Sequence, residues 1–316
     1  MKISRRQFVK AMAAMSAASM LAACGGSSGN GSSGGKKALT FQIWDVAQKE
    51  GMEAMCAAYT QQHPEVSIEV QVTSWNEYWT KLEAAATSNQ MPDIFWMHTN
   101  ELLKYADNGM LADCTDIVEK DKFSEVSLSN AMGSNGTLYA VPKDKDTVGL
   151  VYNKEMFDAA GVAYPDENWT WDDLVSASEK IYAATGKYGY MAYADDQLGY
   201  WNFVYQAGGY ILNEDKTKAG FTQPATEKAM KFYIGLQQND WCPDQTYFAE
   251  TAPGTAFFSE KGAMFLEGDW NILAELQNYP EMVGKWDVAV LPKCPDPESG
   301  DGRATISNGL CLSLIH

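Results

Sequence analysis

The stretch LTFQIWDVAQKEGMEAMCAAYTQQHPEVSIEVQV, residues 39–72, decides the fold class of this chain. Residues 39–44 alternate apolar and polar side chains, which is typical of a strand, and residues 66–72 repeat the alternation. Between them, residues 48–62 carry apolar side chains at helical spacing until Pro64 interrupts the run. A strand, a helix and a strand joined by short connections predict parallel strands in an α/β sheet.

The same alternation continues along the first third of the chain. Residues 76–87 have helical spacing, with Asn76 as a candidate cap, and residues 92–97 are typical of a buried strand. Residues 101–107 predict another helix, which closes at Gly109. We therefore expect an α/β architecture with a parallel sheet.

A second block of strands and helices begins near Val148. Strands are expected at residues 148–152, 263–266 and 286–290, and helices at residues 154–160, 171–185, 199–207, 224–238 and 271–277. Thr170 and Asp173 have the spacing of a capping box. Asp144 and Asp146 are expected in a polar loop between the two blocks.

The first residues of the chain have the order of an export signal. Basic residues that include Arg5-Arg6 precede an uncharged stretch of small residues, residues 11–23, and then Leu21-Ala22-Ala23-Cys24. The paired arginines resemble the twin-arginine motif, with general secretion as the alternative, and the last four residues resemble a bacterial lipobox. We expect a signal peptide at residues 1–23, lipidation of Cys24 and a flexible linker at residues 24–37. The expected location is the outer face of the cytoplasmic membrane, or the periplasm.

Charge limits the classes of partner. Without residues 1–23 the chain keeps 20 lysines and arginines against 41 acidic residues, a net charge of about −21. This balance argues against nucleic acid and anionic membrane surfaces as partners, beyond the lipid anchor itself. Only Arg303 remains among the arginines, which disfavours an anionic ligand, because bidentate recognition of phosphate or carboxylate uses arginine.

The residue types for metal and cofactor chemistry are sparse. The chain has three histidines, no Cys-x-x-Cys pair and no phosphate-binding glycine-rich loop, so we expect neither a metal nor a cofactor. The cysteines after Cys24 are widely spaced, and we expect buried thiols rather than disulfides: Cys56, Cys114, Cys242, Cys294 and Cys311.

Paired carboxylates keep a glycoside hydrolase open as an alternative. The pairs are Asp144/Asp146, Asp172/Asp173 and Asp195/Asp196. Acids at 172 and 173 stand in the first turn of a predicted helix, where they offset the helix dipole. The pair at 144 and 146, between the two blocks, stands in the more suggestive place.

Three predicted strand ends carry groups that suit a polyhydroxyl ligand. In open α/β sheets, ligands bind beyond the carboxyl ends of the strands. Trp44-Asp45 follow the first strand, the second end runs from Trp96 to Thr99 and Asn100, and the third holds Asp144 and Asp146. Tryptophan faces can stack on sugar rings, while carboxylates and amides bind hydroxyl groups. Core packing is the alternative role for each tryptophan.

Several segments in a fixed order resemble the extracellular solute-binding proteins of carbohydrate ABC transporters, the family 1 group that includes maltose-binding protein. The matching segments are MPDIFW (91–96), YADNGML (105–111), LYAVP (138–142), YNK (152–154), TWDDL (170–174), QAGG (206–209), GAM (262–264), GDW (268–270) and WDVAVLP (286–292). The resemblance implies two α/β lobes of the type II kind that close on a ligand at a hinge. The implied lobes are residues 38–145 plus 293–316, and residues 146–292.

The resemblance also implies positions in the ligand site. Trp270 matches the sugar-stacking tryptophan of the family, Asp146 an acidic cleft position and Trp201 an aromatic residue near the cleft. Trp44 and Asp45 follow the first strand, where members contact sugar.

Two neighbouring positions depart from the family pattern. Thr99 and Asn100 fall where some members use a charged pair, which puts maltose-like specificity in doubt. The family continues beyond the Leu291-Pro292 position with further helices, so we expect a C-terminally truncated reading frame. Residues 312–316 match one translation of a transposase adaptor used in sequencing libraries, and we expect them not to be native.

The sequence therefore predicts a monomeric, non-enzymatic lipoprotein that captures a neutral mono- or oligosaccharide. It would deliver that sugar to the permease subunits of an ABC importer. A binding protein for another neutral solute and a secreted glycoside hydrolase are the alternatives.

Overall fold

The computed structural model describes residues 36–213 and 217–315. The predicted signal peptide, Cys24 and the linker up to residue 35 lie outside the described residues, as does His316. Among the described residues, no helix combines the length and the apolar character needed to cross a bilayer.

The first lobe follows the predicted alternation of strands and helices. Its elements are β1 (Lys37–Ile43), α2 (Lys49–Gln62), β2 (Val66–Val72), α3 (Trp75–Thr87), β3 (Ile94–His98) and α4 (Thr99–Ala106), followed by the short α5 (Glu125–Asn130). β1 lies between β2 and β3 and runs parallel to both. Helix α3 begins one residue earlier than predicted, and Ser74, not Asn76, is its N-cap.

Two long strands connect the lobes, and they correct the predictions of a polar loop and of a parallel sheet. β4 (Val141–Asn153) and β8 (Ser307–Leu314) are antiparallel, and β8 also pairs antiparallel with β3. Asp144 pairs with Leu310 and Asp146 with Asn308, so both aspartates lie within a strand. The pairing joins segments far apart in the sequence, which a local pattern does not reveal.

The second lobe is built on the other half of β4. At Val148 the strand takes β6 (Gly262–Gly268) as its new partner, and β7 (Trp286–Ala289) pairs with β4 from Leu150 onward. β5 (Tyr188–Tyr190) lies parallel to β6 at the far side. The helices of this lobe are α6 (Lys154–Ala160), α7 (Trp171–Thr185), α8 (Trp201–Gln206), α9 (Pro224–Leu236), α10 (Gln245–Glu250), α11 (Pro253–Phe258) and α12 (Ile272–Asn278).

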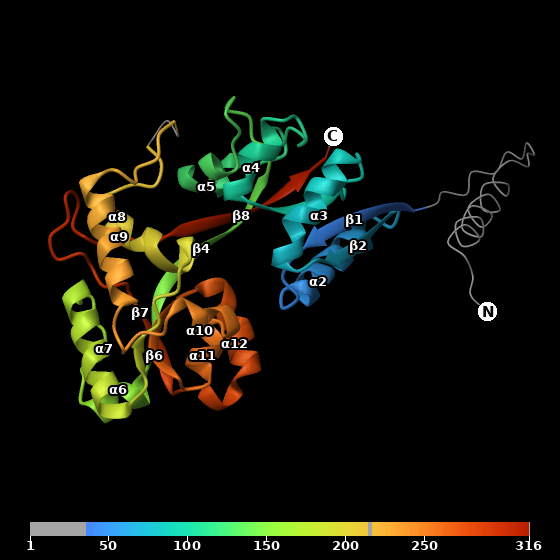
Figure 1. Cartoon of the computed structure of the whole chain (residues 1–316). Helices are drawn as coiled ribbons and strands as arrows, with labels where there is room; N and C mark the ends of the chain where they lie inside the picture. The colour runs from blue at the N-terminus through green and yellow to red at the C-terminus, as the bar shows by residue number, and fades with distance from the viewer. Residues whose placement is uncertain (1–35, 214–216, 316) are drawn as a thin grey trace, which may run out of the picture.

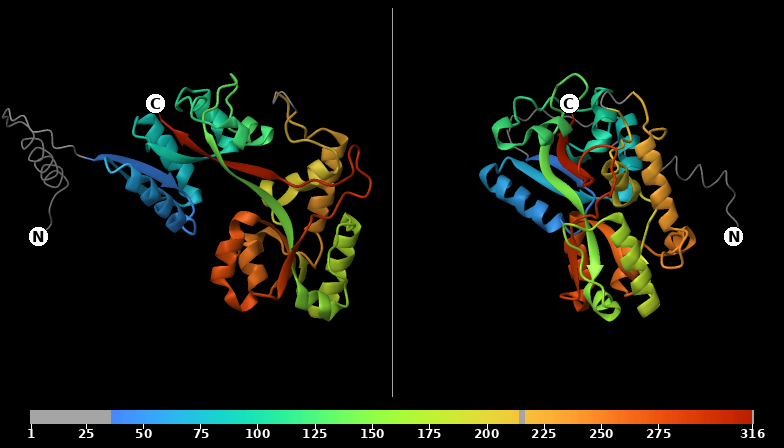
Figure 2. Two further views of the ribbon diagram at one scale, coloured as in Figure 1. Left: turned by 180° about the vertical axis from the view of Figure 1, so that it is seen from behind. Right: turned by 90° about the vertical axis from the view of Figure 1, so that its left-hand side faces the viewer.

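Separate apolar clusters stabilise the two lobes. One cluster includes Leu82, Phe95 and Leu111 of the first lobe, and another includes Leu174 and Phe203 of the second. Figure 1 shows the two bodies side by side, with β4 and β8 running from one to the other. The reverse view in Figure 2 shows the same crossing strands. The predicted two-lobe α/β class is confirmed by this architecture.

Residues 293–298, which the predicted limits assign to the first lobe, contact the second lobe. The backbone of Lys293 exchanges hydrogen bonds with Trp169 and Trp171, and the Glu298 amide donates to the Ala207 carbonyl. These contacts hold residues 293–298 against α7 and α8. The limits 38–145 plus 293–316 and 146–292 stay a prediction, and the contacts favour a return at β8.

Local signals place two helix ends as predicted. The capping box of α7 is complete, because Thr170 and Asp173 each bond the other's backbone amide. Gly161 ends α6 in the left-handed region, at a φ of 63°, where glycine meets no Cβ penalty. The five cysteines of the described part are unpaired, four of them buried and Cys56 half-buried.

Candidate functional site

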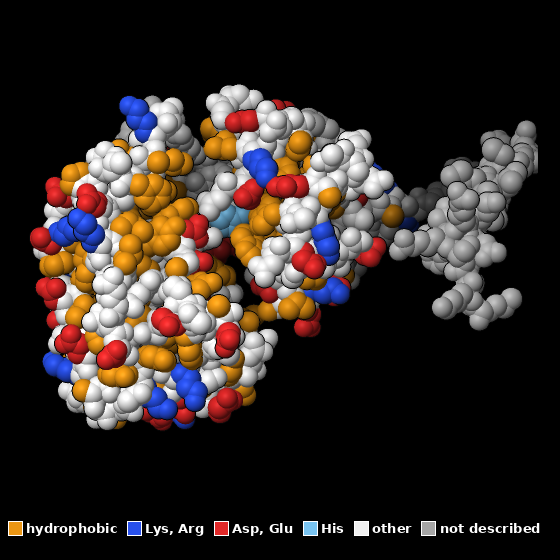
Figure 3. All heavy atoms as spheres, viewed as in Figure 1, with side chains coloured by type: hydrophobic (Ala, Val, Ile, Leu, Met, Phe, Trp, Pro, Cys, Tyr) orange, Lys and Arg blue, Asp and Glu red, His pale blue; other side chains and the backbone are white. Residues whose placement is uncertain are grey.

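A cavity of about 420 Å³ lies between the two lobes. Its volume falls within the range of about 300–1,000 Å³ that is usual for small-molecule sites. Figure 3 shows the hollow between the two bodies, with acidic side chains at its inner edge. The lining residues are Trp44, Asp45, Gln48, Trp75, His98, Asp144, Asp146, Asp195, Gln197, Leu198, Trp270, Asn271, Asn308 and Leu310.

Tryptophans form the wall that the first lobe contributes. Trp44 follows β1 and Trp75 opens α3, and their rings meet edge to face with centroids 5.1 Å apart. Behind them, Tyr78 and Trp96 contact Trp44 with centroids at 4.9 and 5.1 Å. Such edge-to-face pairs contribute about 0.5–1.5 kcal/mol each beyond their burial. The packing therefore fixes the orientation of Trp44 and leaves part of its ring facing the cavity.

Next to this wall, Asp45 is held by its own turn. Its Oδ1 accepts a hydrogen bond from the Ala47 amide at 2.8 Å, and its Oδ2 accepts one from Gln48 at 2.9 Å. The Gln48 carbonyl oxygen in turn accepts a hydrogen bond from Lys143 at 3.1 Å. A carboxylate fixed in this way can accept further hydrogen bonds from ligand hydroxyls, because each oxygen has two lone pairs.

β4 supplies the floor of the cavity with Asp144 and Asp146. Lys143 forms an ion pair with Asp144 and lies over the ring of Trp96, 4.6 Å from its centroid. Burial, reinforced by the charges of Asp144 and Asp269, raises the pKa of Asp146 to about 7, although Lys143 acts in the opposite direction. The floor therefore holds negative charge that the protein compensates only in part.

A π-helical turn, Asp196–Tyr200, brings polar groups of the second lobe to the cavity. Asp195 caps this turn by accepting a hydrogen bond from the Leu198 amide at 2.7 Å. Burial raises the pKa of Asp195 above its ordinary value. The side chain of Gln197 accepts a hydrogen bond from Asn308 of β8, which ties the second lobe to the crossing strands.

Trp270 and Asn271 complete the wall of the second lobe. A Cβ on Gly268 would lie 2.3 Å from the indole of Trp270, so only glycine lets the ring lie against the end of β6. Asn271 donates a hydrogen bond to Glu267 at 2.8 Å. Burial raises the pKa of Glu267 to about 7. Within the described part of the chain, no group of three or more histidine, cysteine or acidic residues has the arrangement of a metal site.

Comparison with known families identifies the class of protein. The family model described as bacterial extracellular solute-binding protein matches residues 44–309. The chain belongs to this family.

Curated relatives of this solute-binding protein carry the names of sugar-binding proteins. It is 26% identical to the lactose-binding protein of Rhizobium radiobacter over 81% of its own chain and 61% of the relative. It is also 26% identical to the arabinooligosaccharide-binding protein of Bacillus subtilis, over 90% of its own chain and 66% of the relative. The chain thus spans just under two thirds of the length of these two relatives.

Solved structures extend the likeness to the fold. An ABC substrate-binding protein of Listeria monocytogenes in complex with cycloalternan matches with a TM-score of 0.77 at 26% identity, covering 89% of this chain and 71% of that chain. A solute-binding protein of Thermotoga lettingae bound with α-D-tagatose matches with a TM-score of 0.75 at 25% identity, covering 89% and 73%.

The structure of this solute-binding protein brings together five of the nine predicted ligand residues. Trp44, Asp45, Asp144, Asp146 and Trp270 line one cavity, although they come from both lobes and from β4 between them.

The other four predicted residues lie outside the lining. Trp96 is fully buried with Leu310 behind Trp44, and its indole nitrogen has no hydrogen-bond partner in the described structure. Thr99 and Asn100 are the first residues of α4, where Thr99 lies beside Gly309 of β8. Trp201 packs against the core of the second lobe.

Sequence reasoning missed several lining residues, of which Trp75 and His98 are the most informative. Trp75 is the first residue of α3, shortly after β2, and His98 is the last residue of β3. The strand-end argument that selected Trp44 also applies to these two positions, so a signal was present for both. Gln197 and Asn308 carried no such signal, because a π-helical turn and a distant strand place them.

Proposed function

We propose that this solute-binding protein captures a neutral mono- or oligosaccharide in the cavity between its lobes and delivers it to an ABC importer. The observation that carries the proposal is the placement of tryptophans on opposite walls, Trp44 and Trp75 against Trp270, around a floor of carboxylates. A sugar ring has an apolar face that can stack on a tryptophan, and it has hydroxyl groups that can donate hydrogen bonds to fixed acceptors. The cavity offers both kinds of partner. The names of the relatives point to the same ligand class.

The charge of the lining supports a neutral ligand over an anionic one. Asp45, Asp144, Asp146 and Asp195 face the cavity, and among the described residues no lysine or arginine lines it. A carboxylate or phosphate on the ligand would meet like charges in a partly desolvated space, which is unfavourable. Uronic acids and sugar phosphates are therefore expected to bind much more weakly than the corresponding neutral sugars.

Closure of the lobes is the expected consequence of binding. The cavity takes residues from both lobes, and β4 and β8 connect them, so a ligand that contacts both walls favours their approach. The closed form would then be the one that the permease subunits recognise. We propose further that lipidated Cys24 holds a monomeric receptor at the outer face of the cytoplasmic membrane, within reach of its permease.

A thermal-shift screen of the full chain tests this function. Lactose, maltotriose and arabinooligosaccharides form the neutral panel, and galacturonic acid with glucose 6-phosphate forms the anionic one. We expect a stabilising shift from at least one neutral sugar and none from the anionic compounds. Stabilisation by an anionic sugar alone would refute a neutral ligand, and no shift from any sugar would favour a receptor for another solute.

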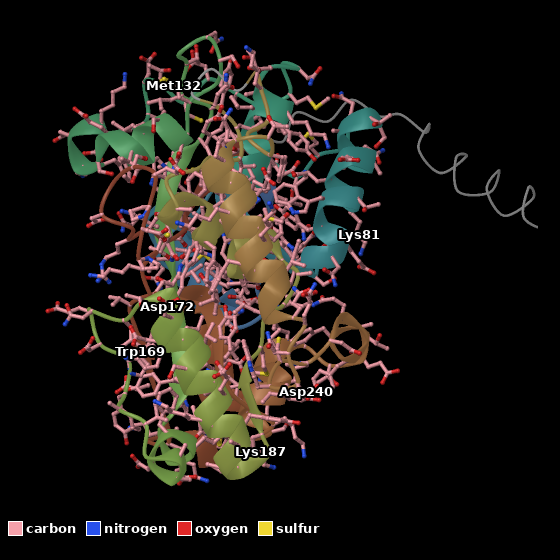
Figure 4. The ribbon with its side chains drawn as sticks, turned by 60° about the vertical axis from the view of Figure 1, so that its left-hand side comes forward. Lys81, Met132, Trp169, Asp172, Lys187 and Asp240 are labelled. Carbon is pink, nitrogen blue, oxygen red and sulfur yellow. The ribbon has the colours of Figure 1, made fainter. Side chains whose placement is uncertain are left out.

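The hydrolase alternative has its own test. Asp144 and Asp146 are the paired carboxylates that face the cavity, and Lys143 already forms an ion pair with the first. Asp172 and Asp173 are exposed at the start of α7, where Figure 4 labels Asp172, and Asp173 is used in the cap of that helix. We expect no release of reducing sugar from a panel of glycosides. Hydrolysis that disappears in Asp146→Asn would establish an enzyme.

A further inference from the structure

His98 is a buried polar residue of the cavity, and core packing alone does not explain its place there. It is the last residue of β3, where it pairs with Leu310 of β8, and its exposed fraction is 7%. Although the residue is more than nine-tenths buried, it belongs to the lining of the cavity. The strand therefore delivers an imidazole ring to the base of the aromatic wall.

One ring nitrogen has a structural role that fixes how the ring lies. Nδ1 of His98 accepts a hydrogen bond from the Asn100 amide at 3.2 Å, so the residue acts as the N-cap of α4. The ring also meets Trp75 edge to face, with centroids 5.6 Å apart and an angle of 69° between the planes. These two contacts leave the ring little freedom to turn.

The acceptor role of Nδ1 also determines where the proton lies. Burial lowers the pKa of His98 to about 4, although the charge of Asp196 acts in the opposite direction. The ring is therefore neutral between pH 5.5 and 8, in spite of the carboxylates around the cavity. A neutral imidazole carries one N–H, and because Nδ1 accepts, that proton is on Nε2.

The Nε2–H group has no acceptor of its own. Within residues 36–213 and 217–315, no group accepts a hydrogen bond from Nε2 of His98. The carboxylates of the lining, Asp45, Asp144, Asp146 and Asp195, offer oxygens that accept hydrogen bonds. A rigid donor without a partner in a cavity of acceptors is a group that a ligand oxygen can satisfy.

We infer that His98 is a specificity-determining residue that donates a hydrogen bond from Nε2–H to a hydroxyl or ring oxygen of the bound sugar. The inference rests on the proposed function, because it assigns this residue to the same cavity. A hydroxyl that accepts from His98 is still free to donate its own proton to a neighbouring carboxylate. Such a position favours a ligand oxygen over a ligand ammonium group, because an ammonium group has no lone pair that could accept the hydrogen bond.

Two substitutions separate the donor role from the capping role. His98→Asn keeps a good N-cap acceptor for the Asn100 amide but is too short to reach the position of Nε2. His98→Gln places an amide donor near that position. The probe is the sugar of the lactose, maltotriose and arabinooligosaccharide panel that binds the full chain most tightly, measured by calorimetry. His63→Asn, on a half-exposed histidine at the end of α2 and outside the cavity lining, is the matched control.

We expect His98→Asn to weaken binding about tenfold, which corresponds to about 1.4 kcal/mol. The loss in His98→Gln is expected to be threefold or less, and His63→Asn to match the unchanged protein. The ratio between wild-type and His98→Asn affinities should stay constant from pH 5.5 to 8, because the ring does not titrate in that range. Nitrogen-15 NMR of the imidazole rings should show the Nε2–H tautomer of His98 throughout.

Two results would overturn the inference and leave the proposed function intact. One is a sugar that binds wild type and His98→Asn equally, which would leave His98 as a cap alone. The other is a ring that carries its proton on Nδ1 or becomes charged above pH 6. By contrast, a wild-type chain that binds no sugar of the panel refutes the proposed function first, so the two failures are distinguishable.

Discussion

The wall of the cavity that comes from the first lobe is stabilised by contacts between aromatic rings, whereas the opposite wall contains and covers carboxylates that are partly or fully buried. We call Trp44 and Trp75, with the rings packed behind them, the aromatic wall. Trp44 alone meets four aromatic side chains there, with centroids between 4.9 and 5.7 Å. This wall belongs to the hydrophobic core as much as to the cavity.

The opposite wall, formed by Asp195, Gln197, Trp270 and Asn271, is called the polar wall. Behind it lies Glu267, whose exposed fraction is 6% and whose pKa burial raises to about 7. Two hydrogen bonds, from Asn271 and from the Gly268 amide, only partly offset the unfavourable burial of its charge. The difference between the walls teaches that one lobe offers a rigid surface, while the other keeps polar groups that a ligand can satisfy.

The largest expected effect tests whether the aromatic wall is part of the core. Trp44→Ala removes a half-buried ring from its contacts with Trp75, Tyr78 and Trp96, and the free energy of unfolding should fall by about 3 kcal/mol. Urea denaturation followed by circular dichroism measures the change. A loss below about 1 kcal/mol would mean that the rings pack without contributing to stability, and the contrast between the walls would then fail.

Trp270→Ala is the matching change on the polar wall. Its ring lies against Gly268 at the edge of the second lobe's core, so stability should fall by less than in Trp44→Ala. Sugar binding should weaken about 30-fold, since burying an aromatic face contributes about 2 kcal/mol. Calorimetry with the best neutral sugar measures the affinity. Unchanged affinity would remove Trp270 from the ligand site.

Local patterns were sufficient to predict much of this architecture. The strand and helix periods of residues 39–107 follow from side chains that are neighbours in the sequence, and the structure reproduces them within a few residues. The same local argument selected Trp44 and Asp45, because a residue that follows a parallel strand lies at the sheet edge where ligands bind. The family resemblance added Trp270, which no local period indicates.

The misplaced residues show where local reasoning ends. β3 is apolar at successive positions, so its pattern does not tell which side chain faces the cavity, and Trp96 turned out to face the core. β8 pairs with two strands from a position about 160 to 220 residues away, and that pairing turned the expected loop of Asp144 and Asp146 into a strand. The strand-end argument also covered His98, but its cap and its ring contact, which distinguish it from its neighbours, become visible only in three dimensions.

The floor between the walls allows a test by pH. In the folded chain Asp146 keeps its proton up to a pH of about 7. In the unfolded chain an aspartate has its ordinary pKa of about 3.9 and loses the proton near that pH. The folded state thus binds more protons between these values, and its stability should fall as the pH rises from about 4 to 7. Asp146→Asn removes this charge.

Relative to the unchanged protein, the free energy of unfolding of Asp146→Asn should therefore be higher by about 1–2 kcal/mol at pH 8 and equal at pH 4. This range is reduced to allow for solvent screening of a half-buried group. Thermal melts across that pH range measure the gain. Asp172→Asn, at an exposed position, is the control and should show no such pH-dependent gain. Equal gains for both variants would trace the effect to overall charge and not to the cavity.

The smallest expected effect comes from a residue that belongs to neither wall. Thr170→Ala removes the N-cap of α7, where the side chain accepts a hydrogen bond from the Asp173 amide, and the free energy of unfolding should fall by about 1 kcal/mol. Sugar affinity should not change, because the cap lies outside the cavity lining. Calorimetry beside urea denaturation separates the two quantities. Weaker binding in this variant would mean that any loss of stability in the second lobe lowers affinity, and the effects at Trp270 would then no longer identify a contact.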